Sequence, residues 1–263
     1  MTEPSIARLD YEEHGKGQPV VLIHGLGLSR HSWRHVAPVL AREFRVITAD
    51  NRGHGKSEAP PPPWTTDLFA ADIAALLDRL EIERAVFVGH SMGGGIAQTM
   101  ALEHPARTVG VALVASGPAL PEPNRASLRN LADQLESSGQ MIDVRVGLRR
   151  LVTPEFAGSH PEEMEAEASR MIADARSYAY SCRANAGRDL SGRLGDLHCP
   201  LLYVGGEQDG GNPAAVHAVA DLYREQVPGA RVHVIPGAAH MIGMEAPEKL
   251  NRLLLEFLRD VTS

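Results

Sequence analysis

The chain has 263 residues, of which 43% are hydrophobic and 22% charged, a composition typical of a soluble globular domain. Its formal net charge of -7 argues against a nucleic-acid function, because phosphate binding requires a basic surface. No run approaches the ~18 apolar residues of a membrane span, and the polar, acidic start of the chain does not resemble a signal peptide. We therefore expect a cytoplasmic protein that does not contact membranes.

Short apolar runs, rich in β-branched residues, recur along the chain. Such runs without alternation are typical of strands buried on both faces of a parallel sheet. A further segment, 8–13, alternates more and predicts an antiparallel edge strand near the start. The predicted buried strands are 19–23, 45–49, 84–88, 109–115, 201–204 and 232–235.

Helical patterns separate these runs. The segment 67–80 carries an apolar stripe, and Thr65 and Thr66 precede it as candidates for its N-cap. Residues 91–103 and 247–258 show helical patterns as well. This alternation predicts an α/β fold with a mostly parallel, twisted sheet and helices on both faces.

One segment interrupts the alternation, because no strand pattern occurs between about residues 120 and 194. We expect a helical cap over 118–194, inserted between two strands of a core formed by 1–117 and 195–263. The helices predicted within the cap are 124–136, 141–151 and 161–184.

A Gly-x-Ser-x-Gly motif, Gly89-His90-Ser91-Met92-Gly93, follows a predicted strand and opens a predicted helix. This is the setting in which a serine sits on a sharp, strained turn with its hydroxyl above the sheet. Side chains two residues before and after such a serine would collide with the backbone, so glycine is needed there. The motif predicts Ser91 as a nucleophile.

A serine hydroxyl needs a base to accept its proton and a carboxylate to orient that base. With this motif the partners follow in the chain order Ser, acid, His. Asp209 comes after the strand 201–204, and His240 comes after the strand 232–235. We expect both at the carboxyl edge of the sheet beside Ser91, with Glu207 as a rival to Asp209. The earlier His24 and His54 are expected only to help shape the site.

Acyl transfer also requires donors for the developing oxyanion. The amide of Met92, directly after the nucleophile, is the first candidate. The second is expected in the glycine-rich loop after the strand 19–23, His24-Gly25-Leu26-Gly27, and we favour the amide of Leu26.

Several other sequence patterns predict structural rather than catalytic roles. The segment 53–57 ends like a phosphate-binding loop but lacks its first glycine and its helix, so we expect a rigid turn, with Asp50 and Arg52 bracing the sheet edge. The arginines of the cap, Arg188 among them, could attract an acidic substrate, but we favour a solvated face balanced by glutamates. Its methionines and tyrosines are expected mostly as packing residues, with some lining an acyl pocket. Cys182 and Cys199 lack metal-ligand spacing and are expected as free thiols.

Together these motifs resemble the α/β-hydrolase superfamily, in the branch that carries a helical cap. The matching segments are His24 to Gly27, Asp50 to Ser57, Gly89 to Gly94, and the later Asp209 and His240. The resemblance implies a mechanism without metal or cofactor, in which Ser91 attacks, His240 relays the proton and Asp209 orients His240. The segment around Ser91 is similar to that of 3-oxoadipate enol-lactonases, general esterases and cofactor-free haloperoxidases.

Two classes of function remain open at this stage. The first is a hydrolase acting on a small carboxylic ester or lactone, with a C–C bond hydrolase acting on a vinylogous diketone as the alternative chemistry. The relatives that cleave C–C bonds usually carry Gly-Pro-Gly soon after the first His-Gly, where this chain has Gly27-Leu28-Ser29. The second class is a ligand-binding, receptor-like protein on the same fold with little turnover.

Overall fold

A seven-stranded sheet forms the centre of the computed structural model, which describes residues 5–172 and 174–263. Its strand order is β1-β3-β2-β4-β5-β6-β7, with β1 antiparallel to β3 and the other neighbours parallel. The six predicted buried strands are confirmed, and the antiparallel edge strand is confirmed with a later start. The strands are β1 (Tyr11–His14), β2 (Pro19–Ile23), β3 (Arg45–Ala49), β4 (Ala85–His90), β5 (Thr108–Val114), β6 (Leu201–Gly206) and β7 (Arg231–Ile235).

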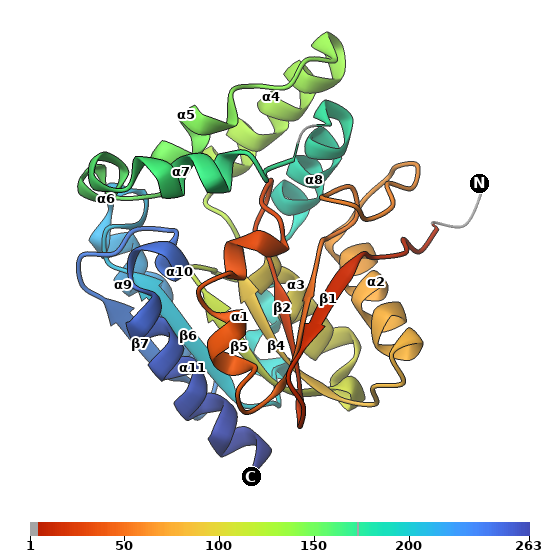
Figure 1. The fold of residues 1–263 in the computed structure, drawn as a ribbon, viewed down its shortest axis with the longest axis vertical. Helices are drawn as coiled ribbons and strands as arrows, with labels where there is room; N and C mark the ends of the chain where they lie inside the picture. The colour runs from red at the N-terminus through yellow and green to blue at the C-terminus, as the bar shows by residue number, and fades with distance from the viewer. Residues whose placement is uncertain (1–4, 173) are drawn as a thin grey trace.

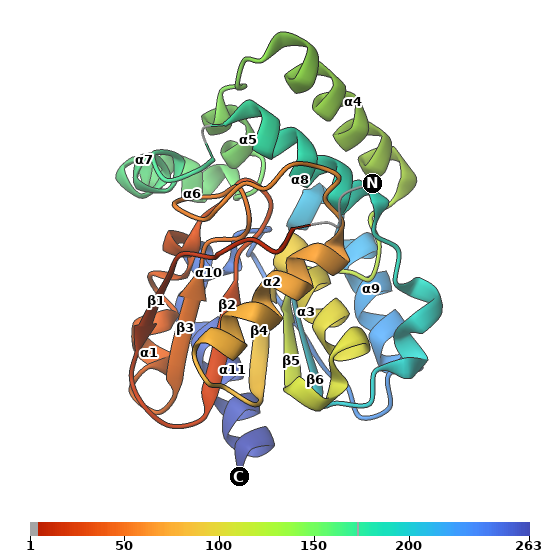
Figure 2. The same cartoon turned by 90° about the vertical axis from the view of Figure 1, so that its right-hand side faces the viewer.

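Helices cover both faces of this sheet, as Figure 1 and Figure 2 show. One face packs against α2 (Thr66–Arg79), α3 (Met92–Glu103) and α9 (Pro213–Gln226). The other packs against α1 (Ala37–Leu40) and α11 (Pro247–Thr262). The predicted fold class, a mostly parallel sheet between two helical layers, is confirmed.

The continuous apolarity of the strands follows from this arrangement. In β2, Val21 and Ile23 join the core on the α2–α3 side, whereas Val20 and Leu22 join the core on the α11 side. Local capping sets the start of α2, where the side chain of Thr65 accepts a hydrogen bond from the N–H of Leu68. Short 3-10 turns occur at Arg30–Trp33, Pro105–Arg107, Ser191–Asp196 and Asp209–Gly211.

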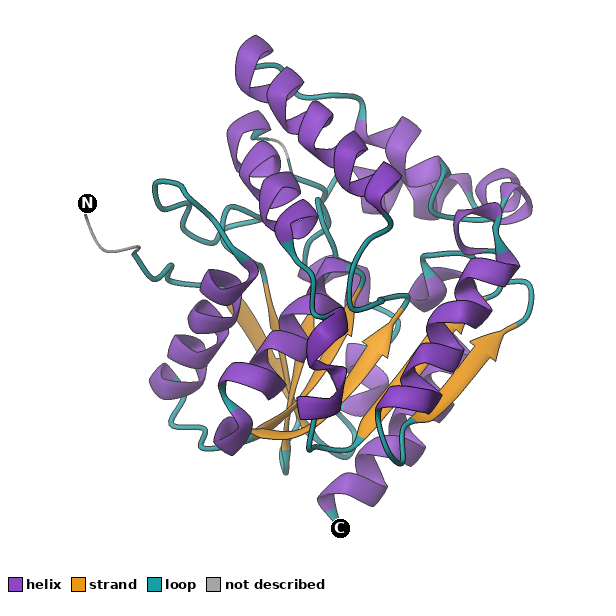
Figure 3. Ribbon diagram, turned by 180° about the vertical axis from the view of Figure 1, so that it is seen from behind, coloured by secondary structure: helices purple, strands orange, loops and turns teal. Residues whose placement is uncertain are grey.

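A helical insertion between β5 and β6 lies beyond the carboxyl ends of the strands (Figure 1). Seen from behind, these helices form a separate group above the sheet (Figure 3). The segments that lead from the core into the insertion and back again lie side by side. Ala119 forms a β-bridge with Asp189, and the N–H of Leu190 donates to the carbonyl oxygen of Pro118 at 3.1 Å. The insertion contains α4 (Glu122–Ser138), α5 (Val144–Arg149), α6 (Pro154–Ser159), α7 (Pro161–Ala168) and α8 (Ala175–Gly187).

The sequence prediction for this insertion needs two corrections. A single helix over 161–184 is wrong: α7 ends at Ala168, the N–H of Ile172 then donates to the carbonyl of Gly27 at 2.9 Å, and Asp174 caps α8. Helix α6 was missed, although Thr153 at its N-cap and Pro154 at its first position are standard start signals.

Every helix in the described part of the chain is too short or too polar to cross a lipid bilayer.

Candidate active site

Ser91 occupies a strained turn between β4 and α3. Its backbone angles are φ 54° and ψ -117°, outside the φ/ψ regions that residues other than glycine ordinarily adopt. A Cβ atom added at Gly89 would lie 2.1 Å from the carbonyl oxygen of Gly93, and one added at Gly93 would lie 2.1 Å from that of Ile23. Both glycines of the motif are therefore required by the close approach of strand, turn and helix.

Asp209 and His240 meet at the carboxyl edge of the sheet. Asp209 opens the turn after β6, His240 lies in the loop after β7, and Asp209 Oδ2 is 2.8 Å from His240 Nδ1. Burial alone would raise the pKa of Asp209, but the charge and the hydrogen bond of His240 hold it below its usual value. The structure gives the rival Glu207 no such contact with His240, and its N–H is bonded to the carbonyl of Ile235.

Ser91 and His240 share the walls of two cavities above the sheet. The larger cavity has a volume of about 500 Å³ and the smaller one about 320 Å³. No hydrogen bond joins the Ser91 hydroxyl to His240 among the described residues. Catalytic hydrogen bonds often tighten only when substrate is bound.

Leu26 and Met92, whose amides are the predicted oxyanion donors, each line one of these cavities. Leu26 lines the larger cavity and Met92 the smaller one, each together with Ser91. Within the described residues neither amide has a backbone or side-chain acceptor, and the first N–H of α3 has no partner inside the helix. Both N–H groups are therefore available to a ligand.

Three buried histidines hold this edge of the sheet in place. The N–H of Gly27 donates to His54 Nε2 at 3.2 Å, and that of Asn51 donates to His24 Nε2 at 2.9 Å. His90 Nε2 donates to the carbonyl oxygen of His240 at 3.0 Å. Burial lowers the pKa of His24 to about 4 and the pKa values of His54 and His90 to about 3. All three are therefore neutral at pH 7 and act as fixed hydrogen-bonding groups.

His90 directly precedes Ser91, and no role was predicted for it from the sequence. Its ring lies 4.8 Å from that of His240, centroid to centroid, and its hydrogen bond fixes the backbone of that loop. Its position inside the Gly-His-Ser-Met-Gly motif was the available signal.

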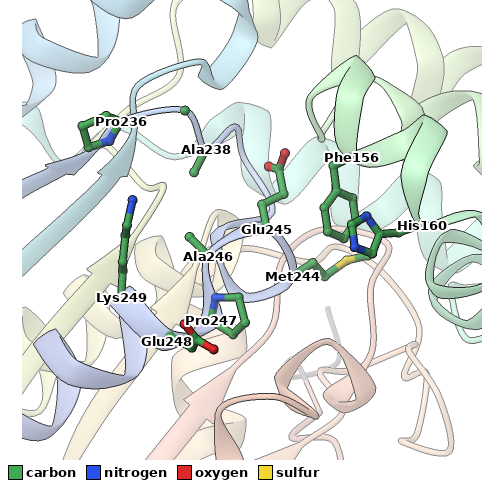
Figure 4. A pocket seen from close by; sticks show the side chains of 11 residues that line it. Phe156, His160, Pro236, Ala238, Met244, Glu245, Ala246, Pro247, Glu248 and Lys249 are labelled. Atoms are coloured by element: carbon green, nitrogen blue, oxygen red, sulfur yellow. The ribbon is translucent and has the colours of Figure 1, made fainter.

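Glu245 was also missed, and it ties the His240 loop to the insertion. It ends α10 (Ile242–Glu245) and accepts hydrogen bonds from the N–H groups of Ala239 at 2.8 Å and Thr153 at 2.7 Å. Figure 4 shows Glu245 between the loop of Ala238 and the insertion helix of Phe156, beside an outer pocket of about 540 Å³. Ser91 does not line that pocket.

The insertion supplies most of the remaining walls of the larger cavity. As expected for some of its apolar residues, Met171 and Tyr178 line this cavity, whereas Met164 packs inside the insertion. A solvated, glutamate-balanced position is confirmed for Arg145, which pairs with Glu165 at 2.6 Å. It is wrong for the arginine at 188, whose side chain is buried because it packs against α3.

The predicted turn after β3 carries the expected charge-assisted bonds. Arg30 Nη1 donates to Asp50 Oδ2 at 2.8 Å, and Arg52 Nε donates to Asp72 Oδ2 at 2.6 Å. Cys182 and Cys199 are free thiols. Among the described residues no three His, Cys, Asp or Glu side chains form a group that could hold a metal ion.

Residues 18–247 match the alpha/beta hydrolase fold family. The chain belongs to this family. It is 30% identical over 247 residues to 3-oxoadipate enol-lactonase 2 from Acinetobacter baylyi, covering 92% of this chain and 90% of that protein. A thermophilic esterase from Thermogutta terrifontis, solved with malate bound, superposes with a TM-score of 0.88 at 30% identity, covering 97% of this chain and 94% of that one.

A further relative is longer than this chain. The dihydrolipoyllysine-residue acetyltransferase component of the acetoin cleaving system from Pseudomonas putida is 32% identical over 260 residues, which are 92% of this chain. The match spans only 64% of the length of that relative.

Proposed function

We propose that the protein hydrolyses a small carboxylic ester or lactone through an acyl-enzyme formed on Ser91. The observation that carries this proposal is the Asp209–His240 hydrogen bond of 2.8 Å. His240 lines both cavities beside the strained Ser91 turn, and Asp209 lines the smaller one. A nucleophile, a base and a group that orients the base are the minimum set for this chemistry.

In the proposed mechanism His240 Nε2 takes the proton of Ser91 as the hydroxyl attacks the substrate carbonyl. Asp209 holds Nδ1 of the same ring, which fixes the tautomer and stabilises the imidazolium that forms. His240 then protonates the leaving oxygen, and a water molecule activated by His240 releases the acyl group. The mechanism uses only side chains and backbone amides of this chain.

The amides of Leu26 and Met92 would bind the negative charge that develops on the carbonyl oxygen. Each such donor is worth about 2.7–4 kcal/mol in the transition state. The hydrogen bonds from Gly27 to His54 and from Ile172 to Gly27 support the loop that carries Leu26. These contacts would keep the amide in place before substrate arrives.

We assign catalysis and substrate selection to different parts of the chain. Residues 1–117 and 195–263 would supply the chemistry, and residues 118–194 would act as a cap that selects the substrate. The relatives support an ester or lactone as the bond that is cleaved, since one is named an enol-lactonase and another an esterase.

The test is turnover of p-nitrophenyl acetate and of a lactone panel by the wild type, Ser91→Ala and His240→Ala. Removing the nucleophile should lower kcat on the order of 10⁶-fold, and removing the base should have a comparable effect. Ser137→Ala, exposed on α4, serves as the control and should retain full activity. Full activity in Ser91→Ala would overturn the proposal, and a folded wild type without turnover would favour the ligand-binding alternative.

A further inference from the structure

We propose that the substrate carries a carboxylate group, bound by Arg188 and Asn185 in the smaller cavity beside Ser91. The inference rests on the proposed ester or lactone hydrolysis and adds the chemical class of the substrate.

Arg188 is a buried cation that has no carboxylate partner among the residues that the structure describes. It follows α8, and only 6% of its surface is exposed. Its Nη1 donates to the carbonyl oxygens of Gly117 at 2.9 Å and Pro118 at 2.7 Å, and its Nε has no partner among the described residues. The neighbouring Asp189 instead accepts from the N–H of Ser191 and from Arg125.

The buried guanidinium of Arg188 lacks a group that balances its charge. A buried charge without a counter-ion carries a large desolvation penalty, and the two carbonyl dipoles offset only part of it. Burial lowers the pKa of Arg188, yet a guanidinium stays protonated at neutral pH. A carboxylate from the substrate would supply the missing charge, and its two oxygens match the donor geometry of a guanidinium.

Asn185 provides a second, independent sign of a ligand. It lies on α8 with 5% of its surface exposed, and its acceptor Oδ1 has no hydrogen-bond partner among the described residues. A carboxylate could bind this amide only through its Nδ2 donor. The described residues contain six buried side-chain polar atoms without a partner, and two of them belong to residues that line this cavity. Buried polar groups are normally satisfied, so an unpaired donor and an unpaired acceptor on two residues beside one cavity point to a polar ligand. Its carboxylate would accept from Arg188 and from Asn185 Nδ2.

The glycines after Ser91 explain how the guanidinium comes so close to the nucleophile. A Cβ atom added at Gly95 would lie 2.3 Å from Arg188 Nε, so only glycine lets this side chain rest against the first turn of α3. The amino end of α3 contributes a further partial positive charge. Gly95 is thus required by the position of Arg188, whereas Gly89 and Gly93 are required by the turn at Ser91 itself.

The distances favour a short spacer between the carboxylate and the scissile carbonyl. Four residues at a rise of about 1.5 Å place Gly95 about 6 Å beyond Ser91 along α3, a span that a short dicarboxylic chain bridges. The smaller cavity would hold this charged arm, since Ser91, His240 and Arg188 all line it. The larger cavity, with Leu128, Met171 and Tyr178, would receive the apolar remainder.

The experiment compares esters that differ only in charge. Mono-p-nitrophenyl glutarate is measured against p-nitrophenyl pentanoate, and 4-acetoxybenzoate against phenyl acetate, so that the charge lies on the acyl side in one pair and on the leaving side in the other. The wild type should prefer the anionic ester about tenfold or more in kcat/KM in at least one pair. Arg188→Gln should abolish that preference through KM, and Arg188→Lys should keep part of it.

A matched control separates this site from general charge effects. Arg183 lies on the same helix, is exposed, and pairs with Asp133 and Glu136, so Arg183→Gln should keep the anionic preference. Because preference is a ratio, a uniform loss of active protein in any variant does not alter it. An unchanged preference in Arg188→Gln would overturn the inference.

A measurement on the wild type avoids dependence on any variant that fails to fold. Glutarate should inhibit hydrolysis of p-nitrophenyl pentanoate competitively, whereas 1,5-pentanediol should not. The inference is wrong if the wild type shows neither an anionic preference nor inhibition by glutarate, even while Ser91-dependent turnover of neutral esters upholds the proposed function. Turnover that persists in Ser91→Ala would instead refute the proposed function itself.

Discussion

The carboxyl edge of the sheet and the α4–α8 insertion are built from different kinds of contact. Near the carboxyl edge of the sheet the polar side chains are buried and bonded, as in the Arg52–Asp72 pair, both 1% exposed, and in the bonded rings of His24 and His54. In the insertion most ion pairs, such as Arg145–Glu165, lie in solvent. Chemistry requires fixed distances, whereas a substrate-selecting surface tolerates weaker contacts, because exposed ion pairs stabilise a fold only slightly.

The two regions are nevertheless joined at the site. The N–H of Met241 donates to the carbonyl of Leu151 at 3.0 Å, and Glu245 bonds to Thr153. These contacts lie beside the catalytic candidate His240. Movement of the insertion would therefore reach the His240 loop directly.

Within this comparison of the two regions, the largest expected effect comes from removing the charge of Asp209 at the edge of the sheet. Asp209→Asn keeps the size of the side chain but removes the charge that orients His240, so kcat should fall on the order of 10⁴-fold with little change in KM. Glu207→Gln, the rival acid after the same strand, should retain near-normal kcat. Ester-hydrolysis kinetics on both variants make the comparison, and the reverse pattern would reassign the acid.

Next in size is the contrast between a buried and an exposed arginine. Arg52→Met leaves Asp72 buried without its partner and should lower the free energy of unfolding by about 3–5 kcal/mol, measured by urea denaturation. The double variant Arg52→Met/Asp72→Leu should recover part of this loss, because no unpaired charge remains. Arg145→Met in the insertion should leave the urea midpoint unchanged, and equal losses at both sites would remove the distinction between the regions.

A third comparison replaces one crowded glycine and one exposed glycine by alanine and measures stability. Gly93→Ala pushes a methyl group against the backbone of β2 and should destabilise the protein by about 3 kcal/mol or more. Gly158→Ala has open space around the added carbon in α6 and should stabilise it by about 0.5–1 kcal/mol, as alanine does in helices. Thermal melts of both variants give the signs, and a neutral Gly93→Ala would mean that the strained turn relaxes freely.

A pH dependence of stability set by the buried histidines gives the last comparison. Their pKa values rise from about 4 for His24 and about 3 for His54 and His90 in the folded protein to about 6.5 on unfolding. Unfolding therefore takes up protons between these values, and stability falls as the pH is lowered from about 6.5 toward 4. Each histidine contributes up to about 1.4 kcal/mol per pH unit.

His54→Gln tests this slope, because the Gln oxygen can still accept the hydrogen bond from Gly27 but does not titrate. Urea denaturation between pH 4.5 and 6.5 should show a shallower loss of stability than in the wild type. His217→Gln, on the surface of α9, should leave the slope as it is. Parallel pH profiles for wild type and His54→Gln would show that His54 is not held neutral.

The sheet and its edge were predictable from the sequence because both rely on local rules. A strand buried on both faces must be apolar throughout, as 19–23 and 84–88 are, and parallel strands bring their carboxyl ends to one edge. The placement of Ser91, Asp209 and His240 at that edge follows from counting strands. The crowded turn explains why Gly89 and Gly93 mark the nucleophile.

The insertion was less predictable because tertiary contacts shape it. The break between α7 and α8 accompanies the Ile172–Gly27 hydrogen bond, which periodicity does not record. Arg188 looks like any other cap arginine in sequence, and its burial depends on the missing side chain of Gly95, far away along the chain. The role of Glu245 likewise depends on Thr153 lying opposite it.

The most direct measurement of the central claim is labelling with a fluorophosphonate probe, followed by mass spectrometry of the labelled peptide. An activated serine held by Asp209 and His240 should react once per chain, at Ser91, and Asp209→Asn should slow the labelling strongly. A folded protein that remains unlabelled, or that is labelled at a different serine, would contradict the account.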